Sequence, residues 1–185
     1  MARTLLVLLG SLLAALALSG PALAGGGDYV FASGTEAEQR QVVRALEASS
    51  FPWDVVPAQI TIHIAPGTGS FARPGHIWLD SNVLAAGRFS WAIVQDEYAH
   101  QVDFFLFDSS IREQLTAALG AAAWCRETPG LAHDQYGCER FTSTLVWAFW
   151  QSRGNAYRPT SKNDESAAMA PAAFRALLAR ILAGS

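Results

Sequence analysis

Four ionisable residues fall close together in the stretch 91–105, which reads WAIVQDEYAHQVDFF. On a helix of 3.6 residues per turn, Asp96, His100 and Asp103 stand at positions i, i+4 and i+7, so they share one stripe. Glu97 lies beside that stripe. Carboxylates and an imidazole in this arrangement can hold a metal ion or transfer protons.

This polar stripe has two interpretations. An amphipathic helix needs a polar side, and acids with one histidine are ordinary occupants of it. The flanking segments 91–94 and 104–107 are strongly apolar, however, and favour burial at both ends of the helix. Because charges in the middle of a buried helix need partners or a metal, we favour a site over a solvated face.

The spacing suits zinc-dependent hydrolysis. Two ligands one helical turn apart can bind a single ion, while a glutamate that follows the first ligand activates the metal-bound water. In this scheme His100 is the second ligand, Glu97 is the general base and Asp96 is the first ligand.

Three segments together resemble a known catalytic core. VQDEYAHQVDF, with HIWLD before it and GCERFTSTL after it, is similar to the core of zincin metallopeptidases of the gluzincin type. In that family one helix carries His-Glu-x-x-His, a preceding strand aligns the substrate, and a glutamate of a later helix is the third ligand. The resemblance covers residues 59–150 and implies a zincin-like domain, one zinc ion and Glu139 as the third ligand.

The sequence departs from the family pattern at the first ligand, where Asp96 stands in place of histidine. A carboxylate can bind zinc, but aspartate reaches less far from the helix than histidine does. A second anionic ligand makes the ion less electrophilic, so the pKa of a bound water stays higher. We therefore expect metal binding to survive this change more readily than catalysis.

Other polar residues have open roles. Asp103 either accepts a hydrogen bond from the non-ligating nitrogen of His100 or is a surface acid near the end of the helix. Tyr98 and Tyr136 could donate to an oxyanion, although packing is the commoner role for tyrosine. His133 is a further candidate ligand, and its alternative is a solvated loop histidine.

Cys125 and Cys138 are the two cysteines of the chain. We predict a disulfide between them, and the alternative is a pair of buried free thiols. The chain-entropy model gives such a short loop a stabilisation of about 3 kcal/mol. The bridge would also fix the start of the helix that presents Glu139.

Residues 1–24 have the features of a secretory signal peptide: Arg3, an apolar run over 5–18 and the small residues Ala22 and Ala24. The run is too short for a membrane span, and no later segment is apolar for long enough, so no stable membrane insertion is expected. Residues 25–185 are then a single domain that is secreted, extracellular or in the cell envelope. The sequence does not indicate an oligomeric state.

The charge of the chain excludes one class of partner. Without Arg3 the formal net charge falls from −3 to −4, since 12 basic residues then face 16 acidic ones. A mildly acidic surface without a basic stripe argues against nucleic acid.

The periodicity predicts mostly helices and one small sheet, an α+β fold. Strands are expected over 60–64 and 76–80, as a small sheet or a hairpin with an elaborated connection. Helices are expected over 35–49 with Thr35 and Glu38 as a capping box, 90–107, 111–124 with Ser110 and Glu113 as a capping box, 138–150 and 171–183.

The leading functional prediction is a secreted metallopeptidase that cleaves peptide or protein substrates. One alternative is a catalytically inactive zincin-fold protein that binds a peptide, a glycan or a component of the envelope. A second alternative is a helical structural protein whose acidic stripe is only solvated.

Overall fold

The computed structural model describes residues 26–125 and 128–184, so the predicted signal peptide lies outside the described residues. No helix in these two ranges is both long and apolar enough to cross a membrane. The elements follow in chain order as β1 (Tyr29–Phe31), α1 (Glu36–Ala48), η1 (Trp53–Val55), β2 (Ile60–Ala65), β3 (Phe71–Arg73), β4 (His76–Asp80), α2 (Ser81–Leu84), η2 (Gly87–Ser90), α3 (Trp91–Leu106), α4 (Ser109–Ala118), η3 (His133–Gln135), α5 (Gly137–Phe149), η4 (Glu165–Ala167) and α6 (Pro171–Ala183).

The sheet has four strands in the order β1-β2-β4-β3. Strands β1, β2 and β4 are parallel, and β3 is an antiparallel edge strand. Ile60, Ile62 and Ile64 alternate with partly exposed residues, and each is at most 4 % exposed. One face of the sheet therefore belongs to the core, as the period of two predicts. The other face carries polar and aromatic side chains.

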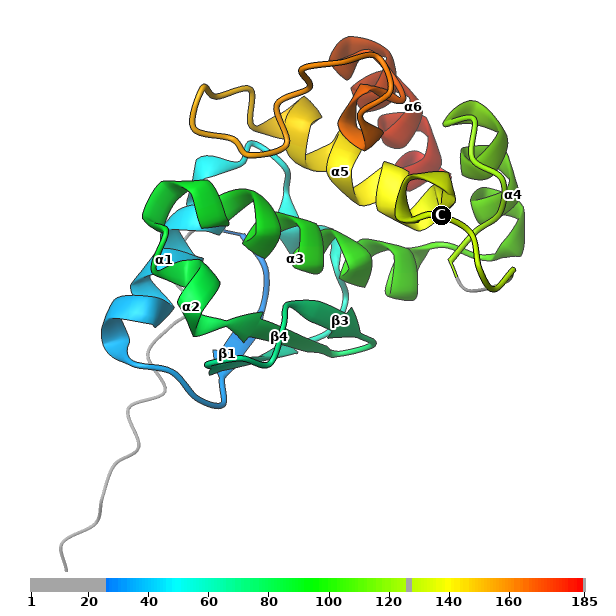
Figure 1. Ribbon diagram of the computed structural model, residues 1–185. Helices are drawn as coiled ribbons and strands as arrows, with labels where there is room; N and C mark the ends of the chain where they lie inside the picture. Colours follow the sequence, from blue (N-terminus) through cyan, green and yellow to red (C-terminus); the bar gives the residue numbers. More distant parts are fainter. Residues whose placement is uncertain (1–25, 126–127, 185) are drawn as a thin grey trace, which may run out of the picture.

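Helix α3 is the centre of the molecule. It lies between the sheet on one side and α5 with α6 on the other (Figure 1). Every residue from Val94 to Asp103 is buried, which is unusual for a helix of a small domain. Gln95 and Gln101 are 0 % exposed and use their amides to join α3 to its neighbours: the Gln95 Nε2 donates to Ala45 O in α1 over 2.7 Å.

Most predicted elements are confirmed. The mostly helical α+β class and the small sheet are those of the structure, and α6 begins and ends where the sequence predicted. Helix α1 starts with the predicted capping box, in which Thr35 N donates to Glu38 Oε2 over 2.7 Å.

Of the two arrangements predicted for the strands over 60–64 and 76–80, the small sheet is observed: β2 and β4 pair in parallel, and the hairpin joins β3 to β4. The predicted bounds of the next helix are wrong. The helix predicted over 111–124 is α4, which begins at Ser109 because Asp108, not Ser110, caps it by accepting from Ile111 N over 2.8 Å. It ends early because Gly120 adopts a φ of 63°, a left-handed conformation that stops helices.

Candidate metal centre

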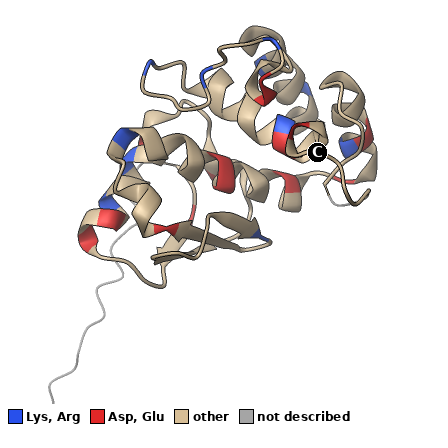
Figure 2. Ribbon diagram, viewed as in Figure 1, with Lys and Arg blue, Asp and Glu red and all other residues tan. Residues whose placement is uncertain are grey.

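The acids and the histidine of α3 are buried. Asp96 and Glu97 are each 7 % exposed and His100 is 9 % exposed. Figure 2 shows acidic positions in the middle of this central helix, where other helices and the sheet surround it. The stripe is therefore not the solvated polar face of an amphipathic helix.

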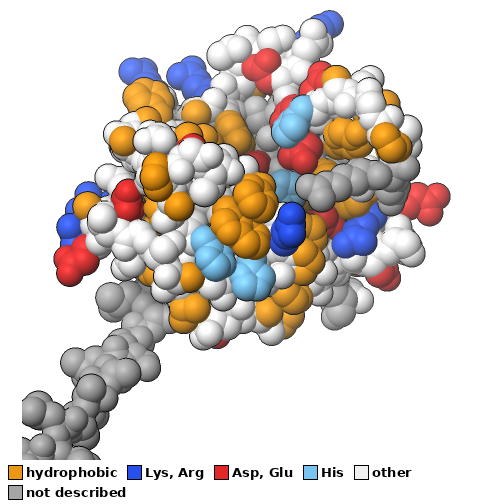
Figure 3. Space-filling view, turned by 60° about the horizontal axis from the view of Figure 1, so that its bottom comes forward, with side chains coloured by type: hydrophobic (Ala, Val, Ile, Leu, Met, Phe, Trp, Pro, Cys, Tyr) orange, Lys and Arg blue, Asp and Glu red, His pale blue; other side chains and the backbone are white. Residues whose placement is uncertain are grey.

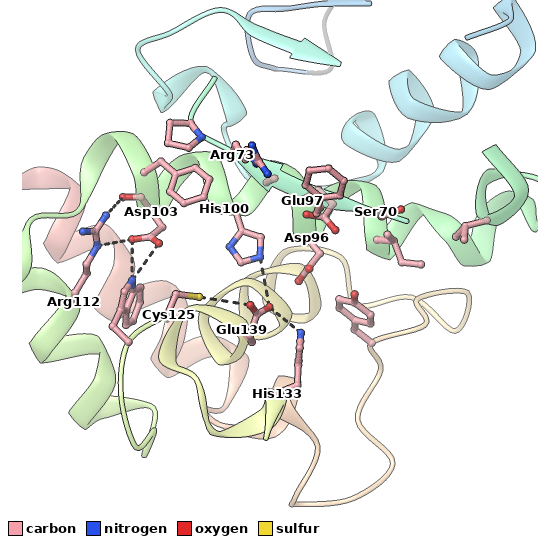
Figure 4. A pocket seen from close by; sticks show the side chains of 18 residues that line it. Ser70, Arg73, Asp96, Glu97, His100, Asp103, Arg112, Cys125, His133 and Glu139 are labelled. Carbon is pink, nitrogen blue, oxygen red and sulfur yellow. Dashed lines mark hydrogen bonds and ion pairs between the residues drawn. The ribbon is translucent and has the colours of Figure 1, made fainter. Parts of the chain in front are cut away.

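Helix α5 brings the third predicted ligand to α3. Glu139 is in the first turn of α5, and its Oε2 lies 3.5 Å from His100 Nε2. One ligand atom each of Asp96, His100 and Glu139 lies within 4.8 Å of the others. The structure thus brings the three predicted ligands together from two helices that pack against each other, as Figure 4 shows.

This group of atoms fits a divalent cation. Asp96 Oδ1 is buried and has no hydrogen-bond partner among the described residues. Leaving a buried carboxylate oxygen without a partner is costly, and a cation at this point would satisfy it. One imidazole nitrogen and carboxylate oxygens are a donor set that zinc accepts. A second group, Cys125, Cys138 and Glu139, is not such a site, because its two sulfurs are joined in a disulfide.

The site concentrates negative charge where water is scarce. Burial raises the pKa of Asp96 to about 6, against the lowering effect of His100. Burial and the neighbouring Asp96 raise the pKa of Glu97 to about 8. Burial alone would lower the pKa of His100, but Glu139 and the two acids of α3 raise it to about 9. A bound cation would relieve the repulsion among the three carboxylates.

Glu165, a carboxylate that the sequence did not predict at the site, holds His133. His133 Nδ1 lies 2.6 Å from Glu165 Oε1, and its Nε2 lies 3.2 Å from Glu139 Oε2. Ser143, one turn after Glu139 in α5, donates to Glu165 Oε2 over 3.1 Å. His133 therefore does reach the site, in an orientation fixed by Glu165. No motif marks Glu165, which is in the polar segment between α5 and α6.

The tyrosine beside the site is Tyr157, and not Tyr98 or Tyr136, which the sequence suggested. Tyr157 lines the pocket, and burial together with the charge of Asp96 raises its pKa. Tyr98 is 0 % exposed and packs edge-on against Trp53, so its predicted packing role is the one observed. Tyr136 donates its hydroxyl to Thr128 O over 2.9 Å, and neither Tyr98 nor Tyr136 lines the pocket.

Asp103 has neither of its two predicted roles, the hydrogen bond to His100 or the surface acid. It is 2 % exposed, so it is not a surface acid. Its Oδ1 accepts from Arg112 Nε over 2.8 Å, and both carboxylate oxygens lie 3.2 Å from Trp124 Nε1. No hydrogen bond joins it to His100 among the described residues; its carboxylate is engaged by Arg112 of α4 and by Trp124. Asp103 anchors these two neighbours.

The predicted disulfide between Cys125 and Cys138 is present, with a Cα–Cα distance of 5.4 Å. It joins the segment after α4 to the first turn of α5, directly before Glu139. The Sγ atoms of Cys125 and Cys138 lie 3.6 Å and 3.5 Å from Glu139 Oε1. The bridge therefore packs against the candidate ligand itself.

The candidate ligands lie in a pocket of about 860 Å³. Figure 3 shows acidic and histidine side chains together with hydrophobic ones around the centre of the face that holds it. Its walls come from the edge strand β3, from α3, from α4, from the start of α5 and from Tyr157; they include Phe71, Arg73, Ile93, Phe104 and Arg112. The pocket is large enough for several residues of a peptide.

Comparisons of the chain with protein-family models, curated proteins and solved structures find no match.

Proposed function

We propose that this protein is an exported metal-dependent peptidase, with one zinc ion held by Asp96, His100 and Glu139 and with Glu97 as general base. The observation that carries the proposal is the convergence of these three ligands around the unpartnered Asp96 Oδ1. The predicted leader and the disulfide support an oxidising, extracytoplasmic location.

Each residue of the site has a chemical task in this proposal. Bound zinc would polarise the scissile carbonyl and lower the pKa of a water molecule. Glu97 accepts the proton of the attacking water and passes it to the leaving amine. Its pKa of about 8 without a cation means that it is mostly protonated at neutral pH, and a nearby divalent cation favours the carboxylate that the reaction needs.

Two further residues assist. His133 lies against Glu139 with its ring held by Glu165, so it keeps that carboxylate in one orientation. Tyr157 lines the pocket with a hydroxyl that stays protonated and can donate a hydrogen bond to the substrate.

One observation favours a second candidate function. Asp96 and Glu139 are both anionic, so zinc at this site would be less electrophilic than at a site with two histidines. The alternative is therefore a protein that keeps the metal and binds a peptide or an envelope component without cleaving it.

Zinc titration against a fluorescent chelator tests the metal site. We expect one zinc per chain, and we expect His100→Ala and Glu139→Gln each to weaken binding at least about tenfold. Glu113→Gln is the matched control, since it removes one acidic charge at an exposed position. Equal zinc affinity of the wild-type protein and His100→Ala would overturn the proposal.

Cleavage of internally quenched peptides separates the two functions. We expect the zinc-loaded protein to hydrolyse peptides and Glu97→Gln to keep zinc while losing activity by about 100-fold or more. A protein that binds zinc but cleaves no peptide would be the non-catalytic alternative.

A further inference from the structure

Two arginines line the pocket, and the structure treats them differently. Arg112 is neutralised, because its Nε lies 2.8 Å from Asp103 Oδ1 and its Nη2 donates to Asp103 O over 3.2 Å. Arg73 has no ion pair with a carboxylate of the described residues; its guanidinium lies 5.9 Å from the ring centroids of Phe71 and Trp78. The N–H donors of the Arg73 guanidinium are therefore available to a ligand.

The aromatic contacts hold this guanidinium without using its donors. The rings of Phe71 and Trp78 are stacked with centroids 4.8 Å apart and planes 10° apart. A guanidinium over aromatic rings is attracted by their electrons, and its N–H groups remain free at its edge. Arg73 is therefore pre-positioned for a planar anionic group.

The backbone of Arg73 is fixed relative to the metal ligands. Gln101, the residue after His100, is fully buried and donates its Nε2 to Arg73 O over 3.0 Å. Its Oε1 accepts from Gly75 N over 2.9 Å. Gly75 has a φ of 78°, which permits the tight β3–β4 turn that Gln101 clamps. The edge strand and α3 therefore place Arg73 and His100 in one pocket, on the same side (Figure 4).

The charges of the pocket give a substrate a direction. Its floor holds the acidic side chains of Asp96, Glu97 and Glu139, and those that are ionised repel an anionic group. Arg73 attracts such a group at the β3 wall. A peptide with one carboxylate would consequently lie with that carboxylate at β3 and its neutral backbone over the acids.

We propose that Arg73 is a carboxylate-binding residue that gives the pocket a preference for anionic peptides. The carboxylate is either the C-terminus of the peptide or the side chain of an acidic residue, since both present the same two oxygens to a guanidinium. This inference rests on the proposed function for its substrate class, but it concerns binding and does not depend on hydrolysis.

A charge on an exposed edge strand also protects the strand from pairing with another chain. That role of Arg73 needs no ligand, does not depend on the chemistry of a peptide, and could be filled equally well by another positively charged side chain. Peptide binding by charge-matched probes separates the two roles.

Isothermal titration calorimetry on the full mature chain, with and without zinc, measures the binding. Glu97→Gln provides the background, so that no peptide is cleaved. The probes are four versions of acetyl-Ala-Phe-Ala-Glu-Ala: with Glu or with Gln, and each with a free or an amidated C-terminus. The Gln peptide with an amidated end carries no carboxylate and is the reference.

We expect at least one carboxylate peptide to bind at least about tenfold more tightly than the reference, and Arg73→Gln to remove that difference without changing the reference. Arg73→Lys should restore part of it, because it restores the charge but not the planar fork. Preference for a free end would identify the C-terminus, and preference for Glu would identify an acidic side chain.

Arg88→Gln is the matched control, since Arg88 also lies over two rings, those of Trp91 and Trp150 at 5.7 Å, but does not line the pocket. Three results would overturn the inference: no binding of any probe, equal affinity for all four, or equal losses in Arg73→Gln and Arg88→Gln. A preference that needs Arg73 in a protein that binds no zinc would instead overturn the proposed peptidase and leave the carboxylate site standing.

Discussion

At the scale of single residues, the chemistry of the site depends on Asp96. Its carboxylate is buried, its Oδ1 has no partner among the described residues, and its pKa is raised to about 6 by burial. These are properties of a group that interacts with something outside the chain or that lowers the stability of the fold. Asp96 stands in a group of residues that could hold a cation, and a bound cation would satisfy the unpartnered oxygen.

Changing this residue tests that explanation. Asp96→His replaces a short anionic ligand by the longer neutral imidazole, so we expect tighter zinc binding by about tenfold and higher peptide hydrolysis. Asp96→Asn keeps the size of the side chain and removes the charge, so we expect weaker binding by about tenfold. Competition with a chelator measures both affinities.

The exposed Glu113 supplies the control for net charge, as Glu113→Gln should leave zinc affinity unchanged. Unchanged affinity and activity in both variants of Asp96 would contradict its assignment as a ligand.

The residues of the site differ in how far the sequence predicts them. Asp96 and His100 follow from helical spacing, because positions one turn apart share a face whatever the rest of the fold does. The distant Glu139 needed the family resemblance, which implies a ligand on a later helix. Tyr157 lies in an irregular segment and Glu165 begins the three-residue η4, and neither has a periodicity that relates a residue number to a direction in space.

At the scale of elements, the disulfide positions the start of α5. Cys138 is 0 % exposed, packs in the core and directly precedes Glu139, while Cys125 ends the segment that follows α4. A cross-link between positions 13 residues apart reduces the conformational entropy of the unfolded chain. It also holds the first turn of α5 beside α3. The bridge therefore holds the helical turn that carries the candidate ligand Glu139.

Removal of the bridge should affect both stability and the site. We expect the double variant Cys125→Ser with Cys138→Ser to lose about 3 kcal/mol of unfolding free energy and to bind zinc more weakly. Chemical denaturation measures the first effect and chelator competition measures the second. A lower stability with an unchanged zinc affinity would mean that the bridge is a staple without a role at the site.

The elements themselves were predicted where a local signal is strong. The capping box of α1 and the isoleucine alternation of β2 are such signals. Strands β1 and β3 have three residues each, too few for a pattern, and the parallel pairing of β2 with β4 depends on the path of the connection between them, which contains the edge strand β3. The early end of α4 results from Gly120, whose left-handed backbone outweighs the apolar residues that follow.

At the scale of the whole molecule, the fold determines how much free energy the burial of the charged side chains of α3 costs. Helix α3 is enclosed by the sheet and by the C-terminal helices, and the charges that it carries are enclosed with it. The stability of the protein should therefore depend on the protonation of these groups and on the cation that balances them.

The pKa shifts give the sign of this dependence for the metal-free protein. Glu97 has its pKa raised from 4.5 to about 8, so the folded state keeps a proton that the unfolded state releases. His100, raised from 6.5 to about 9, behaves in the same way. Both contributions to stability are fully present below the pKa values of the unfolded state and are lost as the pH rises through those of the folded state. The range for Glu97 overlaps that for His100 at pH 6.5–8, so stability falls most steeply there.

Thermal unfolding over a pH series, with and without zinc, measures this effect. We expect the unfolding free energy of the metal-free protein to fall from pH 5 to 9, and Glu97→Gln to flatten the slope. Zinc binds the deprotonated ligands, so it should raise the melting temperature more at pH 8 than at pH 6; zinc at 100 times its dissociation constant stabilises the fold by about 2.7 kcal/mol.

Glu113→Gln should keep the wild-type slope, because the carboxylate of Glu113 is exposed. A metal-free melting temperature that does not fall over this range, or an equal zinc effect at both pH values, would contradict a buried acidic site built to receive a cation.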